Sequence, residues 1–386
     1  MDFELTPEQR EIQAVAREFA QAEVEPHAAD WDREHRFPTE LYPKLAALGL
    51  MGVCVPEEYG GAGADFVSYV LVLEELSRAD AGVGVTVAVH TSAVTLPILR
   101  FGTDEQRARF VPPLARGEVL GAFALTEAEA GSDAGSLRTT ATPRDGGWHV
   151  SGSKRFISTA RYAGTFLLFA RTDAASSGAA GVSAFVLDAD HVNVTRDEEK
   201  LGLNSTTTSD LVVDADVEGD RLLGDEGKGF TIAMETLDGG RIGIAAQAVG
   251  IAQAAYEAAR DYARERRQFG KPIAEQQAIQ HKLANMSMEI DAARLLVLRA
   301  AWLKEQGRPH TEEGAKAKLF ASETARRQTA EAIQIFGGYG YTKEFPVERY
   351  YRDAKITEIY EGTSEIQRLV IARSLLGLRR QALAQG

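Results

Sequence analysis

The segment IQHKLANMSMEIDAARLLVLRA, residues 279–300, carries the clearest structural signal in the sequence. Its apolar stripe repeats at alternating spacings of four and three residues: Ile279, Leu283, Met286, Ile290, Ala293, Val297 and Ala300. A stripe of this kind lines one face of a long α-helix and is typical of helices that pack in a bundle. Many of the preceding residues, 241–264, are small, which allows helices to approach closely. We therefore predict a helical bundle over residues 231–386.

The middle of the chain follows a different period. Short runs that are β-branched or alternate between apolar and polar residues are separated by turn signals such as RDGG and SSGAAG. These runs are WHVSG, TFLLFARTD, GVSAFVLDAD, HVNVTRD and DLVVDADV. Together they predict an antiparallel β-domain over residues 121–230.

Residues 1–120 are mostly helical in pattern. The first helix is signalled by Thr6 as a cap, Pro7 at the next position and a Glu/Gln pair behind it. The order is therefore helices, sheet, helices, without the alternation of a βαβ fold. We predict an α+β multidomain fold with an N-terminal helical domain (1–120), a middle antiparallel β-domain (121–230) and a C-terminal four-helix-bundle domain (231–386).

The composition is ordinary for a soluble globular protein with more than one domain: 386 residues, 44% hydrophobic and 26% charged. A net charge of −13 offers no electrostatic basis for binding nucleic acid. The single cysteine, Cys54, excludes an intramolecular disulfide and a multi-cysteine metal site. No secretory signal is visible, and the uncharged residues 82–99 contain His, Pro and Thr, which favours a buried core segment over a membrane span. We expect a cytoplasmic protein without a membrane span.

Common phosphate-binding and metal-binding motifs are absent from the sequence. There is no G-x-x-x-x-G-K-[ST] loop and no G-x-G-x-x-G between a strand and a helix, so a dinucleotide would not bind on a Rossmann unit. The seven histidines show no H-x-x-x-H or H-E-x-x-H spacing. We predict no metal site, and we expect isolated histidines such as His90 and His281 to be structural.

Two loops have compositions that suit a ligand. GAFALTEAEAGSDAGSL, residues 121–137, enters a loop of small residues that can bring backbone N–H groups close to a flat polar ligand, although a solvated turn is the simpler explanation. ARERRQFGKP, residues 263–272, places several arginines at a helix end. There they complement the helix dipole, and one of them could also pair with a pyrophosphate.

The stretch ITEIYEGTSEIQRL, residues 356–369, places Glu361 and Gly362 just before a helix. Ser364 and Gln367 have the S-x-x-Q spacing of a capping box, so the helix should begin at about residue 364 or 365. Gly362 permits a turn that other residues resist. A carboxylate beside the partly positive end of a helix has a purely electrostatic explanation, and a catalytic base is the alternative.

These stretches together resemble the acyl-CoA dehydrogenase family of flavoproteins. The resemblance extends over nearly the whole chain, and its strongest motifs are FALTEAEAGSDAGS, ERRQFGKP, IQIFGGYGYTKEFPVERYYRDAKI and IYEGTSEIQRLVIAR, in the family's order. LDGGRIGIAAQAVGIAQ, residues 237–253, is most similar to the short-chain, butyryl-type members. The helical, β, helical order of the family fold agrees with the order predicted above.

The resemblance implies removal of one hydrogen from each of Cα and Cβ of an acyl-CoA thioester, giving the trans-2-enoyl-CoA. Glu361 would take the α-proton, and N5 of FAD would take the β-hydride. The amide of Glu361 and the ribityl 2′-hydroxyl of FAD would polarise the thioester carbonyl. Some relatives, including isovaleryl-type ones, carry the base just before the bundle arginine, but here Gly240 precedes Arg241. We therefore expect Glu361 to be the base and the substrate to be a short to medium saturated acyl-CoA.

The family's binding positions carry over residue by residue. Those implied to bind FAD are Phe123, Leu125, Thr126, Ser132, Phe156, Ser158, Arg266, Phe269, Gln277, Gln334, Gly337, Gly338, Thr363 and Glu365. Those implied to bind the thioester are Ser132, Asp238, Arg241, Tyr360 and Gly362. Arg266 and Gln277 would meet the pyrophosphate, and Gln334 to Gly338 would hold the adenosine end from a neighbouring subunit.

Two departures from the family pattern stand out. Phe156 and Ser158 occupy positions where many relatives have Trp and Thr, although Phe still offers a stacking face and Ser a hydroxyl. Ala128 and Glu129 replace the usual Pro-Gly, which leaves the path of this loop and the role of Glu129 open.

The resemblance also implies an electron-transfer flavoprotein as the electron acceptor and a homotetramer built as a dimer of dimers. An acyl-CoA oxidase that passes electrons to O₂ is one alternative, and the shorter, single-bundle chain favours the dehydrogenase. A non-catalytic flavin-binding relative is another, against which the presence of Glu361 and Arg241 argues. A nitroalkane-oxidising relative would be expected to carry Asp in place of Glu361.

Overall fold

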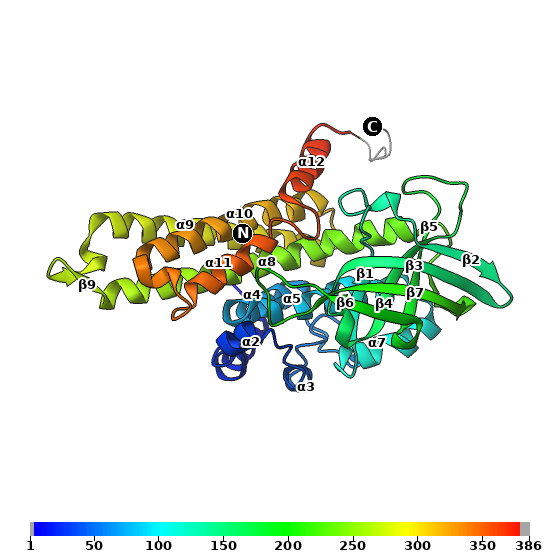
Figure 1. The fold of residues 1–386 in the computed structure, drawn as a ribbon, viewed down its shortest axis with the longest axis horizontal. Coiled ribbons are helices and arrows are strands. Elements are labelled where there is room, and N and C mark those ends of the chain that lie inside the picture. The colour runs from blue at the N-terminus through cyan, green and yellow to red at the C-terminus, as the bar shows by residue number, and fades with distance from the viewer. Residues whose placement is uncertain (1–3, 379–386) are drawn as a thin grey trace.

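The computed structural model describes residues 4–378, with three parts in the predicted order (Figure 1). Long helices extend from one end of the molecule, the β-sheet lies at the other end, and the N-terminal helices pack along one side. Helix α8 (Gly229–Glu265) runs from the sheet into the bundle and so links these two parts. The predicted fold class is confirmed.

Four helices of the described residues make up the C-terminal bundle: α8, α9 (Gln277–Glu305), α10 (Thr311–Phe336) and α11 (Val347–Ile356). The small hairpin of β9 (Arg267–Gln268) and β10 (Lys271–Pro272) closes its far end, between α8 and α9. A last helix, α12 (Ser364–Leu375), projects away from the bundle (Figure 1).

The predicted apolar stripe of α9 faces the bundle core. Its fully buried members are Met286, Ile290, Ala293, Val297 and Ala300. The two residues at its beginning, Ile279 and Leu283, pack at the edge of a second core cluster near the hairpin. The stripe therefore predicted the packing of this helix correctly along its whole length.

The sheet contains one strand before the loop of residues 125–139 and seven after it. They are β1 (Leu120–Ala124), β2 (Thr140–Arg144), β3 (Gly147–Ser158), β4 (Ala163–Arg171), β5 (Val182–Asp188), β6 (Val192–Asp197), β7 (Thr208–Glu218) and β8 (Leu222–Leu223). Their order is β6-β7-β3-β2-β4-β5-β8, with β1 beside β4. Most neighbouring strands pair antiparallel, as predicted, but β1 and β4 pair in parallel and β2 meets β4 in parallel at one residue pair. The chain reverses once in the β2–β3 hairpin and once more between β3 and β4, which makes β4 run in the direction of β2.

The N-terminal part consists of helices, as predicted. Their bounds are α1 (Pro7–Phe19), α2 (Ala28–Glu34), α3 (Leu41–Ala47), α4 (Phe66–Ala79), α5 (Ala81–Ala88), α6 (Leu96–Phe101) and α7 (Asp104–Ala115), with π-helical segments η1 (Ala20–Val24) and η3 (Val89–Thr95). Thr6 caps α1 in a complete capping box with Gln9, which confirms the predicted start of this helix.

The uncharged run predicted to be core lies in α5, η3 and α6. By length and composition, Ala81–Phe101 could cross a membrane, so its polar residues alone do not exclude a span. Of the apolar 18-residue window within this segment, 89% is nevertheless buried inside the protein, as predicted. In this segment, Nδ1 of His90 accepts a hydrogen bond from the N–H of Gly121. Nε2 of the same ring lies 3.0 Å from the carbonyl oxygen of Leu114. His90 thereby fixes β1 to the N-terminal helices.

Candidate active site

The turn between α11 and α12 carries Glu361 and Gly362. Both residues have positive backbone φ angles, 51° for Glu361 and 92° for Gly362. Glycine adopts this region freely, whereas a residue with a side chain loses about 1–2 kcal/mol there. Such strain persists where surrounding contacts hold it, and it is concentrated at functional sites. Glu361 is one of six non-glycine residues with positive φ among the residues that the structure describes.

Two side chains hold this turn from neighbouring helices. Nε2 of Gln367 in α12 donates hydrogen bonds to the carbonyl oxygens of Glu361, at 3.2 Å, and Gly362, at 2.8 Å. Nζ of Lys318 in α10 also donates to the carbonyl oxygen of Gly362, at 2.7 Å. Because both side chains are fully buried, the turn is fixed from within the protein.

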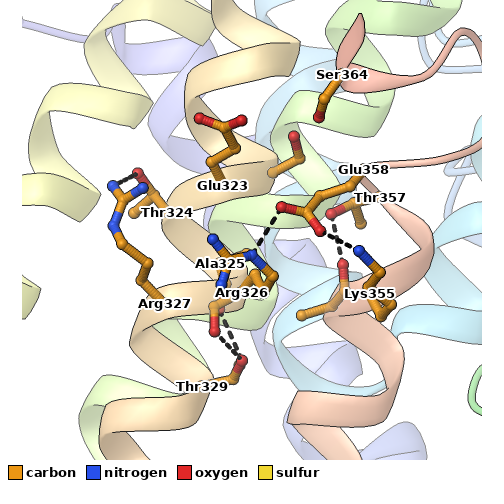
Figure 2. Close-up of polar contacts among 12 residues, drawn as sticks. Glu323, Thr324, Ala325, Arg326, Arg327, Thr329, Lys355, Thr357, Glu358 and Ser364 are labelled. Atoms are coloured by element: carbon orange, nitrogen blue, oxygen red, sulfur yellow. Dashed lines mark hydrogen bonds and ion pairs between the residues drawn. The ribbon is translucent and has the colours of Figure 1, made fainter.

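The chain segment that leads into the turn is anchored as well. Figure 2 shows Glu358 between Arg326 of α10 and Lys355 of α11, with N–O distances of 2.8 Å and 2.6 Å. The hydroxyl of Tyr360, next to the turn, donates to Oε1 of Gln247 on α8. Helices α8, α10 and α11 therefore all contribute to the position of Glu361.

The predicted capping box at Ser364 is wrong by one residue, although α12 does begin there. The N-cap is Thr363, whose Oγ1 accepts a hydrogen bond from the N–H of Ile366 at 3.3 Å. With Thr363 as the cap, the third helical residue is Ile366, whose side chain has no acceptor, so no capping box forms. Glu365, another predicted FAD residue, lies exposed in the first helical turn.

The carboxylate of Glu361 lies against the backbone of α8. Its Oε2 atom is buried and has no hydrogen-bond partner among residues 4–378. A Cβ added to Gly240 would lie 2.9 Å from the carboxylate carbon and closer still to Oε2, so only glycine leaves room here. Burial raises the pKa of Glu361 to about 7, against the opposing effects of Lys318 and Arg241. A carboxylate with this pKa is suited to accept a proton near neutral pH.

A buried ion pair follows on the same helix, next to Gly240. Nη1 of Arg241 lies 2.6 Å from Oδ1 of Asp238, and both side chains are less than a tenth exposed. Oγ1 of Thr311 donates to the other carboxylate oxygen of Asp238 at 2.6 Å. The structure thus brings two predicted substrate residues, Asp238 and Arg241, to the same stretch of α8 as the carboxylate of Glu361.

The loop after β1 is organised by a second buried ion pair. Nζ of Lys154 donates to Oε1 of Glu127 at 2.8 Å, and this carboxylate also accepts the backbone N–H groups of Arg138 and Thr139. Burial lowers the pKa of Lys154 to about 8, with Glu127 opposing the shift. Glu127 therefore ties the two ends of the loop together, whereas Glu129 is exposed.

A β-bulge brings further predicted flavin residues to this loop. The N–H of Arg155 donates to the carbonyl oxygen of Thr126 at 2.9 Å, which places Phe156 beside the end of β1. Phe156 has a φ of 59° in the bulge between Lys154 and Ile157, and 55% of it is exposed. An exposed aromatic ring on a constrained backbone offers a flat face to a planar ligand.

The other flavin positions of this region surround the same loop. Phe123 packs between the core of the N-terminal helices and the core under the sheet, and Leu125 is buried. Ser132 is exposed in the loop, and Ser158 is half-buried at the end of β3.

A second group of predicted FAD residues lies at the far end of the bundle. A cleft of about 560 Å³ there is lined by Arg266, Gly337 and Gly338, together with aromatic side chains that include Tyr339. The guanidinium of Arg266 lies 5.3 Å from the ring centre of Tyr339. The remaining members lie in the hairpin, at the start of α9 and in the last turn of α10: Phe269, which is 94% exposed, Gln277 and Gln334.

The two groups are far apart within one chain. Gly240 and Arg266 are separated by 26 positions along α8, which corresponds to about 40 Å of helix. This length exceeds the reach of a single dinucleotide. The structure therefore does not bring Arg266 and its neighbours together with Glu361 in one protomer.

Several polar residues that shape the site were missed by the sequence-based reasoning: Lys154, Gln247 and Lys318. A signal for Lys318 exists, because it shares the buried face of α10 with Gly314, Ala317, Ala321 and Ala325. A lysine on the apolar face of an amphipathic helix is a candidate for a specific polar contact.

Comparisons with known proteins identify the family of this chain. Models described as the acyl-CoA dehydrogenase N-terminal, middle and C-terminal domains match residues 6–118, 122–215 and 227–376. A short-chain specific acyl-CoA dehydrogenase from Clostridium acetobutylicum is 48% identical over 96% of this chain and 99% of its own. The chain belongs to the acyl-CoA dehydrogenase family, whose members are FAD-dependent oxidoreductases.

Two solved structures are similar over almost their full length. The butyryl-CoA dehydrogenase of Megasphaera elsdenii is 46% identical with a TM-score of 0.96, covering 97% of this chain and all of the other. A structure described under the electron transferring flavoprotein of Acidaminococcus fermentans has the same identity and TM-score, covering 98% of this chain and all of the other.

The residues present fit FAD, the cofactor of the family. The exposed ring of Phe156 beside the loop of small residues suits a planar isoalloxazine. The cleft with Arg266 and two glycines suits a phosphate-bearing or adenosine group, because a guanidinium binds phosphate and glycines allow close backbone approach.

Proposed function

We propose that this protein catalyses the α,β-dehydrogenation of a short- to medium-chain acyl-CoA thioester to the trans-2-enoyl-CoA, with Glu361 as the base that takes the α-proton. The observation that carries the proposal is the carboxylate of Glu361, whose buried Oε2 atom has no hydrogen-bond partner among the described residues and lies against Gly240 of α8. The substrate class rests on the likeness to short-chain specific and butyryl-CoA dehydrogenases.

The residues of the chain supply what proton abstraction requires. Weak hydration makes the Glu361 carboxylate more basic, and the rigid turn holds it in one place. Asp238 and Arg241, buried next to Gly240, would orient the thioester, and the N–H of Glu361 would bind its carbonyl oxygen. When bound, FAD accepts the β-hydride.

The pH dependence of the reaction should report the raised pKa of Glu361. The base acts only when deprotonated, so kcat/KM should rise with pH through an apparent pKa near 7, above the ordinary glutamate value of 4.5. Initial rates with butyryl-CoA and an artificial electron acceptor, measured across the pH range, give this value. A rate that is already pH-independent between pH 5 and 7 would contradict the role assigned to the buried carboxylate.

We further propose that each FAD is bound by two chains, and that the chains form a homotetramer built as a dimer of dimers. The separation of the flavin loop from the Arg266 cleft supports two chains per FAD. Exposed apolar side chains support assembly: Phe269 at the hairpin, and Met288, Leu295 and Trp302 at seven-residue spacing on α9. A stripe of this kind on a long helix is typical of a helix that packs against another one.

Mixed oligomers test the sharing of FAD. Glu361→Gln and Arg266→Ala chains, each with its own affinity tag, should be inactive or nearly so when expressed alone. In a mixed dimer one of the two sites receives both wild-type residues, so random pairing should restore about a quarter of the wild-type activity. If Arg266 served the FAD of its own chain, co-expression would restore none, which is the outcome that refutes sharing.

Electrons are proposed to pass to an electron-transfer flavoprotein, as the likeness to the Acidaminococcus structure suggests. An acyl-CoA oxidase on the same scaffold would pass them to O₂. Turnover with butyryl-CoA in air should therefore reduce an added electron-transfer flavoprotein and form little hydrogen peroxide. Peroxide formed in proportion to substrate consumed would assign the chain to the oxidase alternative.

The division into domains near residues 120 and 230 stays a proposal, supported by strands that begin at Leu120 and by helix α8 that begins at Gly229. We also propose a cytoplasmic location, on the basis of its bacterial short-chain specific relative.

A further inference from the structure

Lys318 is a lysine in the interior of the helical bundle. Its side chain is fully buried, although an ammonium group is among the groups most strongly hydrated in water. Its buried neighbours on α10 include Ala321 and Ala325, and the buried hydroxyl of Ser322 donates to the carbonyl oxygen of Leu319 and not to Lys318. A buried lysine is retained in such surroundings only where its ammonium group makes specific interactions.

The ammonium group of Lys318 makes its hydrogen bond at the turn of Glu361. Nζ donates to the carbonyl oxygen of Gly362 at 2.7 Å. Within residues 4–378, no carboxylate lies within ion-pair distance of Nζ. The same carbonyl oxygen already accepts a hydrogen bond from Gln367 at 2.8 Å, so a neutral amide suffices to satisfy it.

Charge distinguishes Lys318 from a mere hydrogen-bond donor. The carboxylate that interacts with it most strongly is that of Glu361, and Glu358 of the segment after α11 and Glu365 of α12 contribute less. Arg241 of α8 is the other cation nearby. Burial lowers the pKa of Lys318 to about 7, with Glu361 opposing the shift.

The groups that face Glu361 come from several elements. Lys318 of α10 and Arg241 of α8 favour its ionised form, while burial disfavours it. The fully buried hydroxyl of Tyr69 on α4 and the hydroxyl of Tyr360 also interact with Glu361 electrostatically, and both stay neutral because burial raises their pKa far above 10. Lys318 is therefore one of two cations that balance the charge of Glu361.

We propose that Lys318 is a positioning residue for Glu361: its ammonium holds the Gly362 carbonyl, and with it the turn, and its charge compensates the carboxylate in the absence of water. The proposal rests on the proposed function of Glu361 as the base. Lys318 contacts neither substrate nor cofactor in this proposal, since its effect on Glu361 comes from the turn and from its charge alone.

The substitution that tests it is Lys318→Gln, which removes the charge and keeps a donor. Lys316→Gln is the matched control, because Lys316 lies two positions earlier on the same helix and pairs with Glu312 at the surface. Loss of the cation should raise the pKa of Glu361 by about one unit. The acid limb of the plot of kcat/KM against pH should shift to higher pH by about one unit. On this limb kcat/KM should fall about tenfold, and it should recover at higher pH. An unmoved limb in a variant that keeps its FAD would overturn the proposal.

A second measurement needs neither activity nor a stable Lys318 variant. Electrostatic coupling is reciprocal, so removing the charge of Glu361 must lower the pKa of Lys318. Nuclear magnetic resonance titration of [ε-¹³C]lysine-labelled protein should show a lower pKa for Lys318 in Glu361→Gln than in the wild type. An equal pKa in both proteins would overturn the proposal. If the wild type oxidises no acyl-CoA, the proposed function fails, yet this titration still decides whether Lys318 and Glu361 are coupled.

Discussion

Replacement of Glu361 by Gln should leave FAD binding intact and reduce turnover by several orders of magnitude, about 10⁴-fold. Gln has the shape of Glu but cannot accept the α-proton as a carboxylate does. The turn should survive, because its hydrogen bonds are made by the backbone carbonyls of Glu361 and Gly362 and not by the side chain. The measurement is steady-state oxidation of butyryl-CoA, with FAD content read from the flavin spectrum.

Stability provides the control for this variant. The glutamate loses hydration when it is buried, so a neutral amide at the same place should not lower the melting temperature. A Glu361→Gln protein that retains FAD and turns over at a nearly normal rate would remove Glu361 from the mechanism.

Replacement of Gly240 by Ala should cost about 10²-fold or more in kcat/KM without unfolding the protein. The new methyl group would occupy the place of the Glu361 carboxylate, which must then move away from α8. Displacement of a catalytic group by about 1 Å is sufficient for a loss of this size. The loss should appear in kcat as well as in KM, since the base itself is displaced.

Gly239→Ala is the matched control, one position earlier on the same helix. There an added Cβ would meet only the flexible end of Lys304, at 3.3 Å, which can move aside. Both substitutions raise helix propensity by about 1 kcal/mol, so neither should lower stability through the helix itself. Equal activities of the Gly239→Ala and Gly240→Ala proteins would show that the packing of Glu361 on Gly240 has no catalytic role.

Structural features that depend on residues close together in the sequence were predicted correctly. The stripe of α9, the capping box of Thr6 and five strands of the sheet follow from spacing and propensity, and the structure contains them. The parallel pairing of β1 and β4 was missed, because strand direction depends on the path of the chain between strands. The N-cap of α12 was misplaced by one residue, because Thr363 and Ser364 are both good capping residues and it is the hydroxyl of Thr363 that accepts the N–H of Ile366.

The candidate site was located by its motif, but its physical basis was not predicted. Spacing alone leaves Glu361 as a carboxylate beside a helix end. The structure adds a strained backbone, a glycine on a distant helix and a buried lysine. These contacts join residues more than 40 positions apart, and no local pattern encodes them.

The measurement that tests the central claim most directly is anaerobic mixing of the purified flavoprotein with a panel of acyl-CoA thioesters, straight-chain from C4 to C16 and branched. Bleaching of the oxidised flavin band follows removal of the two hydrogens without any external acceptor. We predict rapid bleaching by short and medium straight-chain thioesters, and none on the same timescale in Glu361→Gln. Absence of bleaching with every thioester in the wild type, with FAD bound, would contradict the proposed reaction.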